Sequence, residues 1–146
     1  MQELMRGKRG LIMGVANQRS IAWGIAKACA DAGAELAFTY QGEALERRVR
    51  PLAESVNADI VLPCDVTNAA SMDAVFDTLA RDWGKLDFVV HAIAFADKDE
   101  LTGRYVDTSP ENFQMSLNIS CFSFTAVAHR AEKLMTDGGS LVTLSY

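Results

Sequence analysis

A glycine-containing turn near the start of the chain has the clearest potential for chemistry. Gly14 follows a short apolar run, and Ser20, Ile21 and Gly24 come after a small polar segment. Gly14 allows the backbone to turn sharply, while Ser20 and Ile21 offer free amide groups at the positive end of a helix. Gly24 lets that helix lie close on a sheet. The spacing suits the pyrophosphate of a dinucleotide, although the usual three-glycine fingerprint is absent and similar turns occur in parallel sheets that bind nothing there.

Gln41 ends a second apolar run, at the place where such a sheet usually contacts the adenosine ribose. An acidic residue there favours NAD, and a basic one accommodates the extra phosphate of NADP. Between Tyr40 and Arg47 there is no lysine or arginine to neutralise that phosphate. We therefore expect NADH to be preferred over NADPH. Taken alone, Gln41 is more simply a surface residue in a turn.

Two further apolar runs end in residues with polar or packing potential. Asp65 and Val66 follow the third run, at the edge where open α/β sheets bind ligands. Taken alone, Asp65 is as simply a turn former or helix cap, and Val66 a core residue. His91 ends the fourth run, but a lone histidine at a strand terminus is more often a structural group than a catalyst. We expect His91 to be structural and His129 to lie on the surface.

These positions require a parallel sheet covered by helices, and the sequence alternates accordingly. Five apolar runs, too uniform to leave a wet face, predict strands buried on both sides at residues 10–13, 36–40, 60–64, 88–91 and 140–145. Helical spacing predicts a first helix capped by Ser20, a second over residues 43–55, a third, and a fourth from its cap Ser109 toward Met135. The expected buried positions are Ile21, Ile25, Cys29 and Ala32 in the first helix, Met72, Val75, Phe76, Leu79 and Trp83 in the third, and also Trp23 and Phe113.

Composition limits the class of protein. The 146 residues are 49% hydrophobic and 23% charged, which suffices for one core, so we expect a single domain over residues 1–146. A net charge of -5, with no basic cluster longer than Arg47 and Arg48, argues against nucleic-acid binding. No apolar run approaches the roughly 20 residues of a membrane helix, and the start lacks a secretory signal, which favours the cytoplasm. Cys29, Cys64 and Cys121 are expected to be reduced core thiols, not disulfides or a metal site.

The turn at Gly14 resembles that of the divergent short-chain dehydrogenases and reductases, in which a glycine, five residues and a Ser-x-Ala-x-x-Gly-like segment replace the standard fingerprint. Four more blocks are similar to the same group and follow in the expected order. Together they resemble the NADH-dependent enoyl-acyl-carrier-protein reductases of bacterial fatty-acid synthesis. The resemblance implies a Rossmann-like, doubly wound α/β sheet with strand order 3-2-1-4-5, incomplete at its C-terminal edge. The blocks are residues 14–24, 36–41, 64–66, 91–96 and 144–146.

The resemblance also implies roles for individual residues. It places Gln41 on the adenosine side of NADH. It places Asp65 and Val66 around the adenine, with the carboxylate accepting from the exocyclic amine. Ile93 would pack against the cofactor near its ribose or nicotinamide, and Ala96 would border the substrate.

The implied reaction is reduction of a trans-2-enoyl thioester on acyl carrier protein, with hydride passing from NADH to the β-carbon and an enolate oxygen forming at the thioester. A tyrosine hydroxyl can stabilise that oxygen, and a nearby lysine can hold the nicotinamide ribose. The family has a tyrosine directly after the fifth strand, matched by Tyr146, and a second tyrosine and a lysine farther along. We therefore expect residues 1–146 to lack part of the active site. Tyr146 is either a catalytic residue of secondary role or a strand-end tyrosine packing under the cofactor. The family also suggests a homotetramer, built largely through the fourth helix and the one after it, of which residues 1–146 contain only the first.

Two alternatives remain open. Another short-chain dehydrogenase, acting on an alcohol and carbonyl pair, would generally carry the three-glycine turn and an Asn-Ala-Gly after the fourth strand, where residues 91–94 are His-Ala-Ile-Ala. A nucleotide-binding module without catalytic activity is the second alternative. In either case the long, charged loop at residues 92–108 is expected to be mobile until ligands bind.

Overall fold

The computed structural model describes residues 3–145 and contains one five-stranded parallel sheet with the order β3-β2-β1-β4-β5. This confirms the predicted fold class and strand order. The strands are β1 (Arg9–Met13), β2 (Glu35–Tyr40), β3 (Ile60–Pro63), β4 (Phe88–His91) and β5 (Ser140–Thr143). The α-helices are α1 (Ile21–Asp31), α2 (Glu43–Ser55), α3 (Ala69–Asp82), α4 (Pro110–Leu117) and α5 (Ser123–Ala131).

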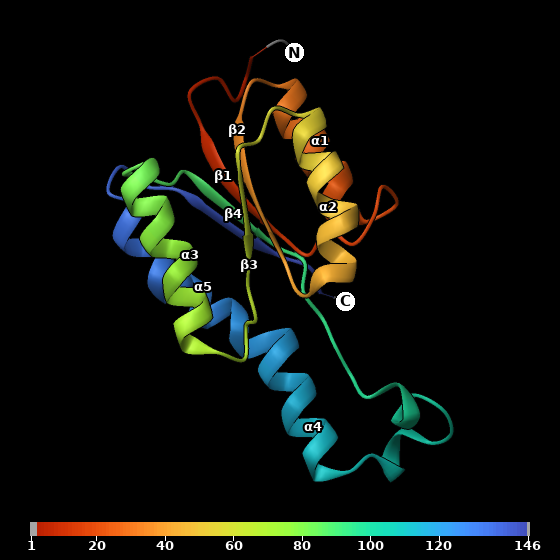
Figure 1. Ribbon diagram of the computed structural model, residues 1–146. Coiled ribbons are helices and arrows are strands. Elements are labelled where there is room, and N and C mark those ends of the chain that lie inside the picture. Colours follow the sequence, from red (N-terminus) through yellow and green to blue (C-terminus); the bar gives the residue numbers. More distant parts are fainter. Residues whose placement is uncertain (1–2, 146) are drawn as a thin grey trace.

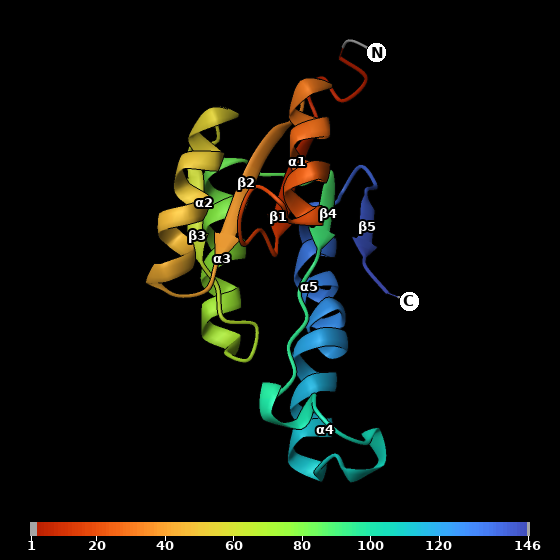
Figure 2. The same cartoon turned by 90° about the vertical axis from the view of Figure 1, so that its right-hand side faces the viewer.

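Helices cover both faces of the sheet (Figure 1). α1 and α2 lie on one face, and α3 and α5 lie on the other. Side chains alternate along β1, so Ile12 belongs to the core beneath α1 and α2, while Leu11 and Met13 belong to the core beneath α3 and α5. Figure 2 shows α4 and the loop before it extending beyond the carboxyl ends of the strands. That end of the sheet is where a doubly wound fold binds ligands.

The prediction that every strand is buried on both faces was right for the central strands and wrong for the two edges. β1, β2 and β4 are almost wholly buried. In β3 the residues are half-buried or exposed, and in β5 Ser140, Val142 and Thr143 are exposed. An edge strand has a neighbour on one side only, so fewer side chains cover it.

The buried face of α1 differs from the predicted one. Ala22, Trp23 and Ala26 are buried, whereas Ile21 is 67% exposed. Gly24 is exposed too, and a Cβ added there would meet nothing within 4 Å. The alanines, not the glycine, therefore allow α1 to lie close to the sheet. The predicted stripe of α3 was right, since Met72, Val75, Phe76 and Leu79 are all buried.

The predicted fourth helix is interrupted. Its cap is confirmed, because Ser109 Oγ accepts from Asn112 N at 3.1 Å. α4 then ends at Leu117, a π-helical segment (Asn118–Phe122) follows, and α5 begins at Ser123. Phe113, expected in the core, is 45% exposed on α4. A π segment shifts the helix face by one residue, which spacing counted along an uninterrupted helix does not anticipate.

The loop at residues 92–108 is held to α4 by polar contacts. It contains two short 3₁₀ turns, Lys98–Glu100 and Tyr105–Asp107. Asp97 N donates to Oδ1 of the buried Asn112 at 2.8 Å, and Ser109 N donates to Glu100 Oε1 at 2.6 Å. These anchors lie at the far end of the loop from the sheet, and the predicted mobility of its remainder stays a prediction.

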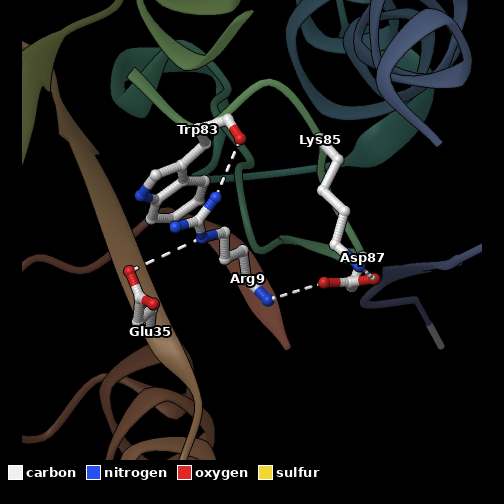
Figure 3. A network of polar contacts seen from close by, with 5 residues as sticks. All are labelled: Arg9, Glu35, Trp83, Lys85 and Asp87. Carbon is white, nitrogen blue, oxygen red and sulfur yellow. Dashed lines mark hydrogen bonds and ion pairs between the residues drawn. The ribbon is translucent and has the colours of Figure 1, made fainter. Parts of the chain in front are cut away.

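Arg9 closes the amino end of the sheet (Figure 3). Its backbone N–H donates to Asp87 Oδ2 at 2.9 Å, and its guanidinium donates to Trp83 O at 2.8 Å. Glu35 Oε2 lies 3.6 Å from Arg9 Nε, and Lys85 Nζ lies 3.6 Å from Asp87 Oδ1. The guanidinium carbon is also 5.7 Å from the Trp83 ring centre, a cation–π distance. These contacts join β1, β2 and the segment before β4 at the end remote from the ligand-binding edge.

Glu100→Gln is expected to loosen the contact between this loop and α4. Hydrogen bonds from Ser109, the backbone N–H first and the hydroxyl second, hold the pKa of Glu100 below its usual value. Because the folded pKa is lowered, the contact stabilises the loop above the ordinary glutamate pKa and is lost as pH falls through the lowered value. Hydrogen-exchange protection at Ser109 should fall in Glu100→Gln at neutral pH, and in the unaltered chain on acidification.

Asp107→Asn removes an exposed carboxylate from the same loop and serves as the control. Its protection at Ser109 should match that of the unaltered chain. Equal protection in Glu100→Gln would show that Glu100 does not anchor the loop.

Candidate functional site

A cleft of about 240 Å³ opens at the carboxyl ends of the strands, beside the point where the strand order reverses between β1 and β4. Segments far apart in the sequence form its walls. They are the turn after β1, the end of β2, the end of β3, the segment after β4 and the π segment. The lining residues are Gly14, Val15, Ala16, Thr39, Tyr40, Gln41, Leu45, Cys64, Val66, Ala92, Ile93, Ala94, Phe95 and Ile119.

Gly14 is required by the close approach of two backbones. It has a φ of +106°, and a Cβ added there would lie 2.0 Å from Ala92 O. Ala92 N in turn donates to Met13 O at 2.9 Å. The turn after β1 and the segment after β4 are therefore in direct backbone contact at the floor of the cleft. A side chain at Gly14 would separate them.

The side chain of Ser20 stabilises the turn after β1. Ser20 is the N-cap residue of α1 as predicted, but its side chain bonds to no amide of that helix. Its Oγ accepts instead from Ala16 N at 2.9 Å and from Asn17 N at 3.1 Å. Both bonds use the oxygen as acceptor, which leaves the hydroxyl proton for a ligand oxygen. α1 begins at Ile21, and Trp23 N already donates to Ser20 O at 3.0 Å, so the amides of Ile21 and Ala22 are the donors of the first turn that face a ligand. The turn thus presents a hydroxyl and amide donors at the positive end of a helix.

The end of β2 forms the next wall, and Gln41 is exposed there. Beside it, the Tyr40 hydroxyl donates to Glu46 Oε2 at 2.8 Å, and Arg50 donates to the same oxygen at 2.7 Å. Burial first, and the Glu46 carboxylate second, raise the pKa of Tyr40. Tyr40 also lines the cleft, and its hydroxyl proton is engaged by Glu46.

Sequence spacing missed a basic hollow next to this wall. Arg47 and Arg48 on α2 and Arg19 on the first turn line a hollow of about 520 Å³, together with Asn17, Gln18, Pro51 and Leu52. Arg19 is distant from Arg47 and Arg48 along the chain, and the fold brings α2 and the first turn to the same hollow. The expectation that no basic group lies near the ribose considered only the residues directly after Tyr40.

Asp65 and Val66 differ in their roles at the end of β3. Val66 lines the cleft. Asp65 Oδ1 accepts from Thr67 N at 2.9 Å and from Thr67 Oγ1 at 2.6 Å, which is the turn-forming alternative. Asp65 can therefore accept from adenine only through the acceptor positions of its carboxylate that Thr67 leaves unused.

The segment after β4 forms the opposite wall. Ile93 lines the cleft as predicted, and so do Phe95, which is 54% exposed, and Ile119 from the π segment. Phe95 N donates to Ser120 Oγ at 3.0 Å, and Ser120 Oγ donates to Phe95 O at 3.2 Å. Sequence reasoning missed Phe95 and Ile119, because the π segment that turns Ile119 toward the cleft has no recognisable pattern. Ala96 is half-buried and directly follows the lining segment.

His91 and Tyr146 complete the predicted set. His91 is fully buried with hydrogen bonds to both ring nitrogens, which confirms a structural role. Burial lowers the pKa of His91 and favours the neutral ring. Tyr146 lies outside the described residues, so its two readings stay predictions.

A parallel sheet of order 3-2-1-4-5 with a glycine turn facing a cleft at the strand switch point defines a Rossmann-like α/β fold. A family profile described as "Enoyl-(Acyl carrier protein) reductase" matches residues 14–146. The chain belongs to this enoyl-acyl-carrier-protein reductase family.

Relatives and solved structures agree with this assignment. The chain is 65% identical over 143 residues to "Enoyl-[acyl-carrier-protein] reductase [NADH] 1" of Rhizobium meliloti, covering 98% of this chain and 53% of the relative. An enoyl-acyl-carrier-protein reductase from Anaplasma phagocytophilum, solved in complex with NAD, matches with a TM-score of 0.96 and 59% identity over 100% of this chain and 56% of that one. The Bacillus cereus enzyme, solved with NADP+ and an indole naphthyridinone, matches with a TM-score of 0.95 and 53% identity, covering 100% and 57%. The chain therefore spans about half the length of the relatives it matches.

Gly14→Val is expected to abolish cofactor binding. The new Cβ would meet Ala92 O, and a positive φ adds roughly 1–2 kcal/mol of strain for a residue with a side chain. Fluorescence titration with NADH measures the loss, with thermal melting as a check on folding. Gly24→Ala is the matched control, since its Cβ meets open space, and it should bind normally and be more stable by about 0.5–1 kcal/mol. Normal binding by Gly14→Val would show that the turn does not contact the cofactor.

The three cysteines are expected to differ in reactivity. Cys121 is exposed, which corrects the prediction of a core thiol, whereas Cys64 is buried in the cleft wall. Burial first, and the neighbouring Asp65 charge second, raise the pKa of Cys64 to about 11. Since the thiolate is the reactive form, alkylation near pH 8 should modify Cys121 first and Cys64 last. Peptide mass spectrometry over time measures the order, and labelling of Cys64 as fast as Cys121 would contradict it.

Proposed function

We propose that this chain forms the NADH-binding part of an enzyme that reduces trans-2-enoyl thioesters carried by acyl carrier protein. The observation that carries the proposal is the backbone contact between Gly14 and Ala92, which creates a floor without side chains under a cleft at the switch point. Such a floor lets a pyrophosphate approach the main chain closely. The family assignment supplies the reaction class.

The residues of the turn fit a pyrophosphate. Gly14 keeps the floor free of side-chain atoms, the Ser20 hydroxyl donates to a phosphate oxygen, and the Ile21 amide at the start of α1 donates to another. The positive end of the helix dipole adds further stabilisation for the negative charge.

The two walls orient the remainder of the dinucleotide. Gln41 and Val66 contact the adenosine half, and the Asp65 carboxylate accepts from the adenine amine through acceptor capacity that Thr67 leaves open. Ile93 packs against the nicotinamide half and excludes water from it. NADH supplies the hydride when bound.

The substrate borders Ala96, and the family resemblance implies for Tyr146 a secondary role in stabilising the developing enolate oxygen. The resemblance to the family implies a second tyrosine and a lysine beyond residue 146.

A homotetramer through α4 accords with the exposed apolar side chains of Phe113 and Leu117 on that helix. Within residues 3–145, no helix has the length and apolar character needed to cross a membrane. We propose a cytoplasmic enzyme from the family assignment.

NADH is expected to bind more tightly than NADPH, because the exposed Gln41 carries no positive charge for a 2′-phosphate. Fluorescence titration with both cofactors, at one ionic strength, measures the two dissociation constants. The Arg47→Gln, Arg48→Gln double variant removes the two positive charges that follow Gln41 most closely along the chain. It should leave NADH binding unchanged. Equal or tighter NADPH binding, weakened in that double variant, would show that the arginine hollow reads the phosphate and would overturn the preference.

Turnover is expected only from a longer form of the protein. The principal tyrosine and lysine implied by the family lie beyond residue 146, and loss of such donors lowers the rate by about 100-fold to 1,000-fold each. NADH absorbance with crotonyl-CoA should fall for a form extended to the relatives' length and stay constant for residues 1–146. Turnover by the short form would place the chemistry on Tyr146 alone, and an inactive extended form would remove support for the proposed reaction.

A further inference from the structure

His91 takes part in a buried polar chain that the proposed chemistry does not use. Its exposed fraction is 0%, Nδ1 lies 2.9 Å from Thr143 Oγ1 on β5, and Nε2 lies 2.7 Å from Ser123 Oγ on α5. The Phe124 ring lies 5.3 Å away, and Met13 is the register neighbour on β1. These neighbours of the imidazole, which come from β5, α5 and β1, carry no charge.

The direction of each hydrogen bond in this chain follows once the proton of the Ser123 hydroxyl is assigned. Ser123 Oγ donates its single proton to Ile119 O at 2.6 Å. It must therefore accept from His91 Nε2, which places the imidazole proton on Nε2. In the neutral ring Nδ1 is then an acceptor, and the Thr143 hydroxyl donates to it. The bonds run from Thr143 through His91 and Ser123 to the carbonyl of Ile119.

This chain joins the sheet to the part of the helix that lines the cleft. Ser123 directly follows the π segment, and Ile119 lies within it. Ser120 lies in the same segment, and its hydroxyl forms hydrogen bonds with the backbone N and O of Phe95. The π segment is thus connected at two places, through Ser123 to the last residue of β4 and through Ser120 to the chain after β4. Both contacts border the cleft wall. π segments of this kind frequently occur at functional sites.

We propose that His91 is a positioning residue: as a neutral ring with its proton on Nε2, it holds β5 and the π segment against the end of β4 and so fixes the wall formed by Ile93, Phe95 and Ile119. The proposal rests on the proposed function only for the identity of the ligand that the wall contacts. An apolar side chain would fill the space but would leave the hydroxyl of Thr143 and the oxygen of Ser123 without this partner.

Nitrogen NMR of histidine tests the tautomer directly. The chain has two histidines, and His129 is exposed on α5, so each spectrum contains its own control. His91 should show a pyridine-type Nδ1 and a protonated Nε2 at neutral pH. A proton on Nδ1 would overturn the proposal. Thr143→Val, at an exposed edge position, should shift the Nδ1 signal, and Thr143→Ser should not.

Ser123→Ala tests the positioning role of His91 and is made in the form of the protein extended to the relatives' length. Hydrogen exchange at Ile93 and Phe95 should quicken by about tenfold or more, with β2 unchanged, and the NADH dissociation constant should rise by about tenfold. Thr125→Ala removes an exposed hydroxyl from the same helix and should change neither value. Unchanged exchange at Ile93 and Phe95 in Ser123→Ala would overturn the proposal. If the unaltered protein does not bind NADH, the proposed function fails, and the exchange and NMR results still decide the role of His91.

Discussion

The backbone contact between Gly14 and Ala92 is the constraint on which the rest of the site depends. Only a residue without a Cβ can occupy a φ of +106° with Ala92 O where the Cβ would be. This contact sets the distance between the turn after β1 and the segment after β4. The cleft lies where the connections that follow β1 and β4 leave toward opposite faces of the sheet.

The remaining interactions keep that geometry from changing. At the amino end, Arg9 joins β1 to β2 and to the segment before β4, so the strands cannot slide relative to one another. At the carboxyl end, Ser20 fixes the turn, Ser120 attaches the π segment to the chain after β4, and Ser123 bonds to His91 at the end of β4. The ligand-facing surface itself is mostly apolar side chains and free backbone groups. Structural polar contacts lie behind it, which leaves the surface available for a cofactor.

The sequence predicted the architecture because hydrophobic periodicity and turn residues are local signals. β4 and α2 have the predicted bounds, and the central strands are buried as expected. Prediction failed where the outcome depends on contacts across the fold. Ile21 and Ala22 are adjacent, and only packing against the sheet decides that the alanine is buried and the isoleucine exposed. Ile119 faces the cleft because of the π segment, and Arg19 approaches Arg47 because α2 returns to the first turn. Neither relation is visible in sequence spacing.

The most direct test of the account is an amide NMR titration of the protein with NADH, because it reports on every position at once. The account predicts that the perturbed amides are those of Gly14, Ser20, Ile21, Gln41, Val66 and Ile93, while Arg9, Trp83 and Asp87 at the amino end stay unchanged. Perturbations confined to the basic hollow or to the amino end, with the Gly14 turn unaffected, would contradict the assignment of this cleft as the cofactor site.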